Sequence, residues 1–161
     1  IKNKLINRHP HVFLKNQSNQ TNDWELNKQK EKKRMSVLDG VPKTLPALSR
    51  SFRIQEKAAS VGFNWNNIEL IWEKINEEII EIKEACKINN HNKIKEEIGD
   101  LLFSIVNLSR FLDVNSEESL KLAISKFQKR FNKIENQIKF KKKSFKDYNK
   151  QELEELWEIN K

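Results

Sequence analysis

Glycine and proline are scarce in this sequence, and their scarcity excludes an architecture that depends on many tight turns. The 161 residues include three glycines and three prolines, while 34% of the residues are charged. A sheet protein needs frequent turns, and turns use these two residue types heavily. We therefore expect an all-α fold. A hydrophobic fraction of 37% is sufficient for the core of one domain of this length.

Long apolar runs are absent as well, and cysteine is nearly so. No stretch approaches the roughly 18 apolar residues that a membrane span needs, and no segment typical of a secretion signal opens the chain. Cys86 is the single cysteine, so it cannot form a disulfide within the chain, which suits a reducing cytoplasm. These absences predict a cytoplasmic protein without a membrane partner, in which Cys86 fills part of the core.

Positive charge is in excess, with a formal net charge of +8. Much of it lies in two clusters, at residues 28–34 and 139–146. Nucleic acid, a membrane surface and a polyanionic small molecule are the partners that such an excess indicates. The simpler interpretation is a solvated helix face or tail, and neither cluster is interleaved with several aromatic residues. Nucleic-acid binding therefore ranks last among the functions considered.

The chain divides into three segments. Residues 1–14 begin without methionine and look like the tail of a preceding unit, and residues 15–43 are polar enough for a linker. Residues 44–161 carry the helical periodicity. Asn115 and Asn149 each precede a glutamate by three residues, which is the spacing of a capping box at a helix start. We predict helices at about 46–62, 67–87, 92–112 and 115–139, and a short one after Asn149.

Apolar positions predict how these helices pack. The fourth helix repeats apolar residues from Leu120 to Ile138 in alternating steps of four and three, which forms a seam for packing against other helices. The third helix is apolar on nearly every side, so we expect it to be buried. The second helix has one apolar face, made by Trp72, Ile75, Ile79, Ile82 and Cys86.

Carboxylates interrupt this apolar pattern on the second and third helices. Helical geometry places Glu78 beside the apolar face of the second helix, with Glu81 one turn along. Glu97 and Asp100 are three residues apart on the third helix. Burying a carboxylate without a partner costs several kcal/mol or shifts its pKa, so this second pair needs a cation or basic partners. The short break at residues 88–91 makes the two helices antiparallel, which brings the pairs face to face.

Four facing carboxylates make a site of hard oxygen ligands. No histidine or cysteine lies at ligand spacing, so Mg²⁺ is expected, with Mn²⁺ as the alternative, rather than Zn²⁺. Mg²⁺ held in this way keeps water-filled positions that phosphate oxygens can take. The competing interpretation is that Glu77, Glu78 and Glu81 are solvated helix surface, paired with nearby lysines. It stays open for these three residues and is weaker for the acids of the apolar third helix.

Two cations on the fourth helix are candidates for phosphate contact. Lys126 and Arg130 are four residues apart and lie on one flank of the apolar seam. Arg130 can donate paired hydrogen bonds to phosphate oxygens, and Lys126 can act as a point charge. Taken alone, they are equally consistent with long side chains that lie over apolar surface and keep their charge in water. The three glycines stand far apart, which excludes a glycine-rich phosphate loop.

Together these motifs resemble the MazG family of all-α nucleoside triphosphate pyrophosphohydrolases. The resemblance covers essentially the whole chain and is strongest to the bacterial two-repeat form, of which this chain is similar to the end of the first repeat, the linker and the complete second repeat. It rests on E-E-x-x-E at 77–81, E-x-x-D at 97–100, LLFSIVNLSRFL and KFQKRF, and on the flanking NRHPHVF, LDGVPKTLPALSRSFRIQEKAASVGFNW and LEELWEINK.

Hydrolysis of nucleoside triphosphates to the monophosphate and pyrophosphate is what the resemblance implies, in an Mg²⁺-dependent homodimer that cleans the nucleotide pool. Glu77 matches a group beside the metal or a general base, Lys126 and Arg130 match positions suited to the triphosphate and its leaving group, and Asn107 and Trp157 are further candidates for substrate contact. The implied metal ligands are Glu78, Glu81, Glu97 and Asp100.

A second class of function stays open beside this one. The chain would then be a non-catalytic helical dimerisation or regulatory module, left from a truncated enzyme and holding partners through its fourth helix. Metal-dependent release of pyrophosphate separates the two hypotheses, because the module predicts none.

Overall fold

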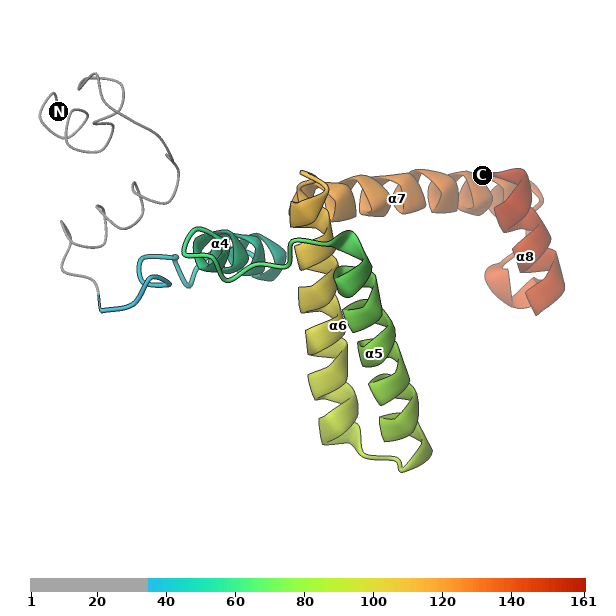
Figure 1. The fold of residues 1–161 in the computed structure, drawn as a ribbon. Helices are drawn as coiled ribbons and strands as arrows, with labels where there is room; N and C mark the ends of the chain where they lie inside the picture. Colours follow the sequence, from blue (N-terminus) through green and yellow to red (C-terminus); the bar gives the residue numbers. More distant parts are fainter. Residues whose placement is uncertain (1–34) are drawn as a thin grey trace, which may run out of the picture. The chain divides into compact units, whose positions relative to one another are not determined.

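A computed structural model describes residues 35–161, and this part of the chain is helical without strands (Figure 1). The prediction of an all-α fold is confirmed, and each predicted helix is present with its ends shifted by a few residues. The predicted segment 1–14 and most of the predicted linker lie outside the described residues. The helices are α4 (Ala47–Ala59), α5 (Ile68–Lys87), α6 (His91–Phe111), α7 (Ser116–Phe140), the 3-10 helix η1 (Phe145–Asp147) and α8 (Lys150–Ile159).

The described residues form two compact units, residues 35–116 and residues 117–161. Helices α4, α5 and α6 belong to the first unit, and nearly all of α7 belongs to the second, together with η1 and α8. Among the described residues, no helix is both long and apolar enough to cross a lipid bilayer.

Asparagines cap the first turn of α5 and the first turn of α6. The Asn67 side chain accepts a hydrogen bond from the backbone N–H of Glu69 and caps α5, and Asn90 caps α6 in the same way through the N–H of Lys93. Between the helices Asn89 has a φ of 51°, a left-handed conformation that asparagine tolerates better than most residues. The tight connection leaves α5 and α6 antiparallel and side by side (Figure 1).

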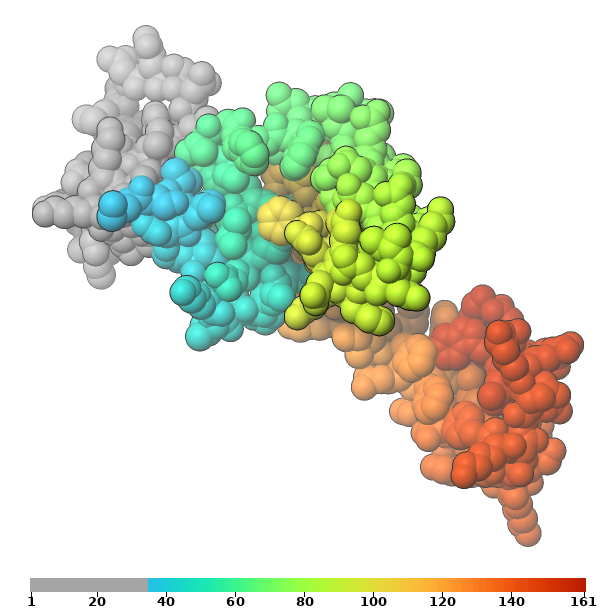
Figure 2. Space-filling view, turned by 90° about the horizontal axis from the view of Figure 1, so that it is seen from below, coloured from blue at the N-terminus to red at the C-terminus, as the bar shows by residue number. Residues whose placement is uncertain are grey.

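The core of the first unit lies between α5 and α6. Ile71, Ile75 and Ala85 of α5 are buried, as is Val106 of α6. Figure 2 views the molecule from the end at which the two helices are joined, where the green atoms of α5 and the yellow atoms of α6 are in contact. Helix α4 packs on α6 and is tied to it by Gln55, whose amide donates a hydrogen bond of 2.8 Å to a backbone carbonyl of α6.

The expected face of α5 is wrong in part. Trp72 is 48% exposed and Cys86 is exposed, so this cysteine does not fill the core. The buried line instead runs through Ile71, Ile75, Glu78 and Ala85, which keeps the helical period but is turned toward a glutamate. The alanine has no side chain beyond Cβ, which suits the close approach of the neighbouring helix at that end of the line.

The expectation that the third helix is buried all round is also wrong. Ile98, Leu102 and Ile105 of α6 are 42–49% exposed. Among the described residues of the first unit, α6 packs chiefly against α4 and α5, and two helices cover only part of its circumference. The apolar surface that sequence analysis assigned to the core therefore forms an exposed stripe on this chain.

In the second unit, the apolar seam of α7 is buried only toward its C-terminal end. Ile134 and Ile138 are buried, and the ring of Phe131 stacks on that of Phe145 in η1 with centroids 5.4 Å apart. Leu120, Ile124 and Phe127 are 48–54% exposed. Helix α8 starts where predicted, and the capping box of Asn149 and Glu152 is present. Helix α7 starts directly after Asn115, the expected cap residue.

Candidate metal centre

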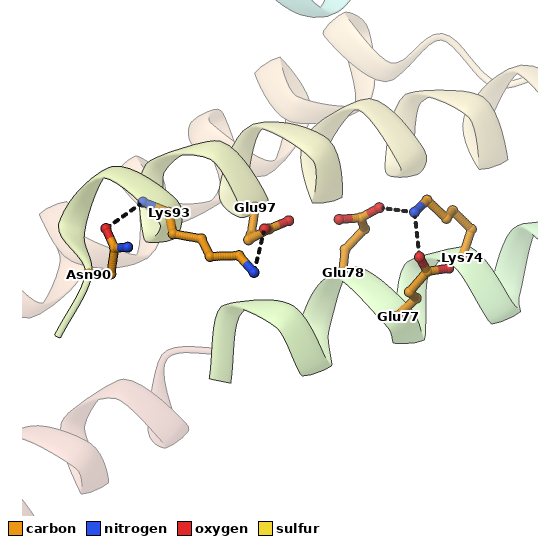
Figure 3. Close-up of polar contacts among 6 residues, drawn as sticks. All are labelled: Lys74, Glu77, Glu78, Asn90, Lys93 and Glu97. Atoms are coloured by element: carbon orange, nitrogen blue, oxygen red, sulfur yellow. Dashed lines mark hydrogen bonds and ion pairs between the residues drawn. The ribbon is translucent and has the colours of Figure 1, made fainter. Parts of the chain in front are cut away.

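Glu78 and Glu97 lie at the contact between α5 and α6, and their carboxylates point toward each other (Figure 3). The two residues are 2% and 5% exposed, so both acids are buried. Asp100 lies one turn along α6 from Glu97 and is exposed. One carboxylate oxygen from each of the three lies within 4.8 Å of the others. Negative charges this close repel one another, so the arrangement favours either a bound cation or a proton.

A second, overlapping cluster lies on α5 alone. Glu77, Glu78 and Glu81 also place one carboxylate oxygen each within 4.8 Å of one another. Glu78 is common to both clusters, Glu81 is half-buried and Glu77 is exposed. Acids of α5 and acids of α6 thus both lie close to the buried carboxylate of Glu78.

Lysines of the same helices serve as partners for the buried acids. Lys74 Nζ lies 2.6 Å from Glu78 Oε1 and 2.8 Å from Glu77 Oε1, and Lys93 Nζ lies 3.8 Å from Glu97 Oε1 (Figure 3). Hydrogen bonds to Glu77 and Glu78 raise the pKa of Lys74 well above its ordinary value. Each lysine precedes its buried glutamate by four residues, which is the distance of one helical turn.

One oxygen of Glu78 has no partner. Its Oε2 atom is buried and makes no hydrogen bond, while Oε1 is paired with Lys74. An orphaned charged oxygen in a buried position is costly, because it has lost water without gaining a substitute. A cation placed among Glu78, Glu97 and Asp100 would satisfy this atom.

Burial also affects Glu97. Its pKa is raised, chiefly because desolvation disfavours the charged carboxylate, and further because the side chain of Glu81 hydrogen-bonds with it. Lys93 acts in the opposite direction. Without a metal, a proton is thus the cation that this part of the cluster attracts, and a divalent ion would compete for the same oxygens.

The donor set fits a hard divalent ion. Both clusters consist of carboxylates, without histidine or cysteine. Oxygen ligands of this kind suit Mg²⁺ and Mn²⁺, whereas structural Zn²⁺ takes cysteine and histidine. The residues present therefore fit the ion that the sequence indicated, and the unpaired oxygen of Glu78 is the atom that most needs it.

A cavity of about 290 Å³ opens beside the acids. Glu78, Lys74 and Asp100 form its charged end, and Asn107 lies in its wall with its amide oxygen 2.9 Å from Arg110 Nη2. Its full lining is Trp65, Lys74, Glu78, Asp100, Phe103, Ser104 and Asn107. The cavity combines aromatic surface, an amide and the candidate metal ligands, which is the composition of a small-molecule site.

The remaining predicted residues lie in the second unit. Arg130 lies over the ring of Trp157 at 5.8 Å from its centroid, and Lys126 is exposed. Both cations line a basic pocket of about 330 Å³, to which Lys129, Lys133 and Lys161 also contribute. The structure thus gathers Lys126 and Arg130 with three further cations, and groups Arg130 with Trp157.

Sequence analysis missed four residues of the site in the first unit. Lys74 and Lys93 each lie one turn before an acid, but this spacing is also common on solvated helix surfaces and did not single them out. Trp65 and Phe103 carried no signal, since an aromatic side chain near a helix is usually part of the core. Only the fold places their rings in the wall of the cavity.

Comparison with known proteins bears on this geometry. Residues 66–134 match the model of the MazG nucleotide pyrophosphohydrolase domain, a range that contains both acidic clusters. A nucleoside triphosphate pyrophosphohydrolase/pyrophosphatase MazG of Thermotoga maritima is 44% identical over 160 residues, which are 98% of this chain and 62% of that protein. The nucleoside triphosphate pyrophosphohydrolase of Escherichia coli K12 is 35% identical over 167 residues, covering 98% of this chain and 64% of its own length.

A further relative is a longer protein. The uncharacterized protein YabN of Bacillus subtilis is 40% identical over 164 residues, which are 34% of its length. The chain therefore spans less than two thirds of each of the three relatives.

Proposed function

We propose that the chain, whose residues 66–134 match the MazG domain, belongs to that family and is a metal-dependent nucleoside triphosphate pyrophosphohydrolase. The reaction consumes a nucleoside triphosphate and one water and yields a nucleoside monophosphate and pyrophosphate. Residues 44–161 would form the catalytic domain. One observation carries the proposal: Glu78 is buried with an unpaired oxygen, next to the carboxylates of Glu97 and Asp100.

Four acids would hold the ion. Glu78, Glu97 and Asp100 form one cluster, and Glu81 approaches Glu78 from the side of α5. Bound here, Mg²⁺ would supply positive charge to phosphate oxygens and acidify a water molecule. Hard oxygen donors suit both Mg²⁺ and Mn²⁺, and the proposal is Mg²⁺ with Mn²⁺ as the alternative.

Residues of the chain would accept the proton and bind the phosphate oxygens. Glu77 is exposed and shares a cluster with Glu78 and Glu81, so it would be able to accept a proton from a water beside these acids. Lys74 lines the cavity and would donate to phosphate oxygens once it parts from Glu78. Lys126 and Arg130 are the cations proposed for the triphosphate and for the charge of the leaving pyrophosphate.

A homodimer acting on the nucleotide pool of the cytoplasm completes the proposal. The exposed apolar stripe of α6, at Ile98, Leu102 and Ile105, supports self-association, because a second copy would remove this surface from water. The single exposed cysteine is compatible with a reducing compartment.

Product analysis tests the activity directly. The chain is incubated with a panel of nucleoside triphosphates in Mg²⁺ or in chelator, and nucleotides and pyrophosphate are separated by anion-exchange chromatography. We expect monophosphate and pyrophosphate in equal amounts, only with the metal. Diphosphate and orthophosphate as products would contradict the proposed bond cleavage. A folded chain that binds nucleotide and releases nothing would favour the non-catalytic module.

A matched pair of variants links the activity to this site. Glu78→Gln removes a buried candidate ligand, whereas Glu84→Gln makes the same change at an exposed position of α5. The proposal requires loss of pyrophosphate release in the first variant and none in the second. Equal activity in both would remove Glu78 from the reaction.

A further inference from the structure

The cavity beside the acids has two ends of different character. Asp100, Phe103 and Asn107 line it from α6 at spacings of three and four residues, so they follow one face of that helix. Seven residues of α-helix span about 10 Å, which separates the charged end at Asp100 from the end at Asn107. A ligand with its phosphates at the metal would reach Asn107 with its opposite end.

Aromatic rings form part of the cavity wall. Trp65, just before α5, and Phe103 on α6 both line the cavity and are 39% and 45% exposed. Exposed aromatic faces in a cavity are suited to stacking on a flat ring, and every nucleobase has such a face. Rings alone do not distinguish one base from another.

Asn107 is the group that can discriminate, because its amide is held in one orientation. Arg110 Nη2 donates hydrogen bonds to the side-chain oxygens of Asn107, at 2.9 Å, and of Asn64. A guanidinium has donors only, so the amide oxygen of Asn107 must face it. Asn107 is 5% exposed and has little freedom to turn over. Its amide nitrogen, with two N–H donors, is then the end left for a ligand.

We propose that this cavity binds the nucleobase and that Asn107, oriented by Arg110, selects bases with a carbonyl at the ring edge farthest from the sugar. Uracil, thymine, guanine and hypoxanthine carry an oxygen there and accept from the Asn107 amide. Cytosine and adenine carry an amino group, which would meet a second donor. Ser104, also in the wall, can both donate and accept and does not discriminate. The proposal deepens the proposed function and rests on it.

Paired substrates test the selectivity in the intact chain. UTP and CTP differ at one edge of the same ring, and GTP and ATP provide a purine pair. We expect kcat/KM to favour the carbonyl member of each pair about tenfold, the effect of one hydrogen bond at a partly open site. Equal kcat/KM values within both pairs would overturn the proposal while leaving the hydrolytic function intact.

Two variants and two control variants identify the atoms responsible. Asn107→Asp replaces the donor with an acceptor, so the preference should reverse toward CTP and ATP. Arg110→Met frees the amide to rotate, so the preference should fall toward unity. Asn92→Asp and Lys95→Met make the same chemical changes at exposed positions of α6 and should keep the wild-type preference. A preference unchanged in Asn107→Asp or in Arg110→Met would overturn the assignment.

Binding separates this proposal from the activity itself. Calorimetric titration with α,β-methylene UTP and α,β-methylene CTP measures base preference without hydrolysis. Preferential binding of the uracil analogue by a chain that hydrolyses nothing would support the base site and refute the proposed function. Binding of neither analogue would overturn both. If Asn107→Asp fails to fold, as judged by circular dichroism, Asn107→Ser takes its place and should abolish the preference.

Discussion

The two compact units of this chain treat charge in opposite ways. In the first unit, buried Glu78 and Glu97 occupy the contact between α5 and α6, while apolar residues of α6 such as Leu102 remain exposed. In the second, Ile134 and Ile138 are buried and the cations lie at the surface. The second unit shows that helices rich in lysine and glutamate can still form an apolar core. The second unit, residues 117–161, has no such buried acids in its core, so a role in chemistry is the better explanation of those in the first unit.

Neutralising one buried acid should give the largest effect. Glu97→Gln removes a candidate metal ligand with almost no change in shape, and we expect pyrophosphate release to fall at least about 100-fold, since even groups that only support a ligand are worth 10- to 100-fold. Helix content by circular dichroism should not change. Glu96→Gln, the exposed neighbour, serves as control. Full activity in Glu97→Gln would mean that the buried acids are structural after all.

Removing surface cations of the second unit should have a smaller effect. Lys126→Met and Arg130→Met each take one charge from the basic pocket, and we expect each to raise the KM for nucleoside triphosphates roughly tenfold, the cost of one charge-assisted hydrogen bond. Steady-state kinetics measures this change. Lys139→Met lies on the same helix outside the pocket and should behave as wild type. An unchanged KM in both variants would assign these cations to solvated surface.

Protonation of the acidic site should appear in the stability of the metal-free protein. The folded state raises the pKa of Glu97 above 4.5, so between 4.5 and the raised pKa the folded chain binds more protons than the unfolded chain. The contribution of Glu97 to the free energy of unfolding is therefore largest at low pH, and this contribution is lost as the pH rises through that window.

Urea unfolding of wild type and Glu97→Gln in chelator, from pH 4 upward, measures this contribution. The stability of the variant relative to wild type should rise with pH through the window and then level off. Saturating Mg²⁺ should raise the free energy of unfolding of the wild type and not that of the variant. A difference that is independent of pH would show that Glu97 keeps its ordinary pKa, and that the acid pair is less strained than its burial indicates.

The smallest effect is expected at Gly99, between two candidate ligands. A Cβ at this position would meet nothing within 4 Å, so Gly99→Ala should raise the free energy of unfolding by about 1 kcal/mol through helix propensity. Urea titration measures it. Gly62→Ala is the opposing control, because Gly62 has a φ of 89° and alanine is strained there. Loss of activity in a stabilised Gly99→Ala protein would indicate that substrate or a second copy approaches this backbone.

Short-range features of this fold were predictable from the sequence. Asn67, Asn90 and Asn149 cap helices with hydrogen bonds to backbone groups two or three residues away, so their effect needs no knowledge of the rest of the chain. The acids that share a cluster were likewise predictable in part, because helical spacing fixes which residues of one helix are neighbours. Their roles as metal ligands remain predictions.

Long-range features were not predictable in the same way. Which face of α5 is buried depends on how α6 docks, and this docking exposed Cys86 and buried Glu78. The exposure of α6 depends on how many neighbours cover it, which no periodicity within the helix records. The orientation of Asn107 required Arg110 and Asn64 to meet in space, across residues that are far apart in sequence.

The pairing of Lys74 with Glu78 has a consequence for how fast a site of this kind can exchange its ion. A buried carboxylate that loses its ion would normally be left bare at a cost of several kcal/mol, and that cost slows departure. Here an ammonium group from the preceding turn, 2.6 Å from Oε1, is tethered within reach. In the proposed enzyme, an internal counterion of this kind would lower the barrier to ion departure and would allow release and reloading within a catalytic cycle.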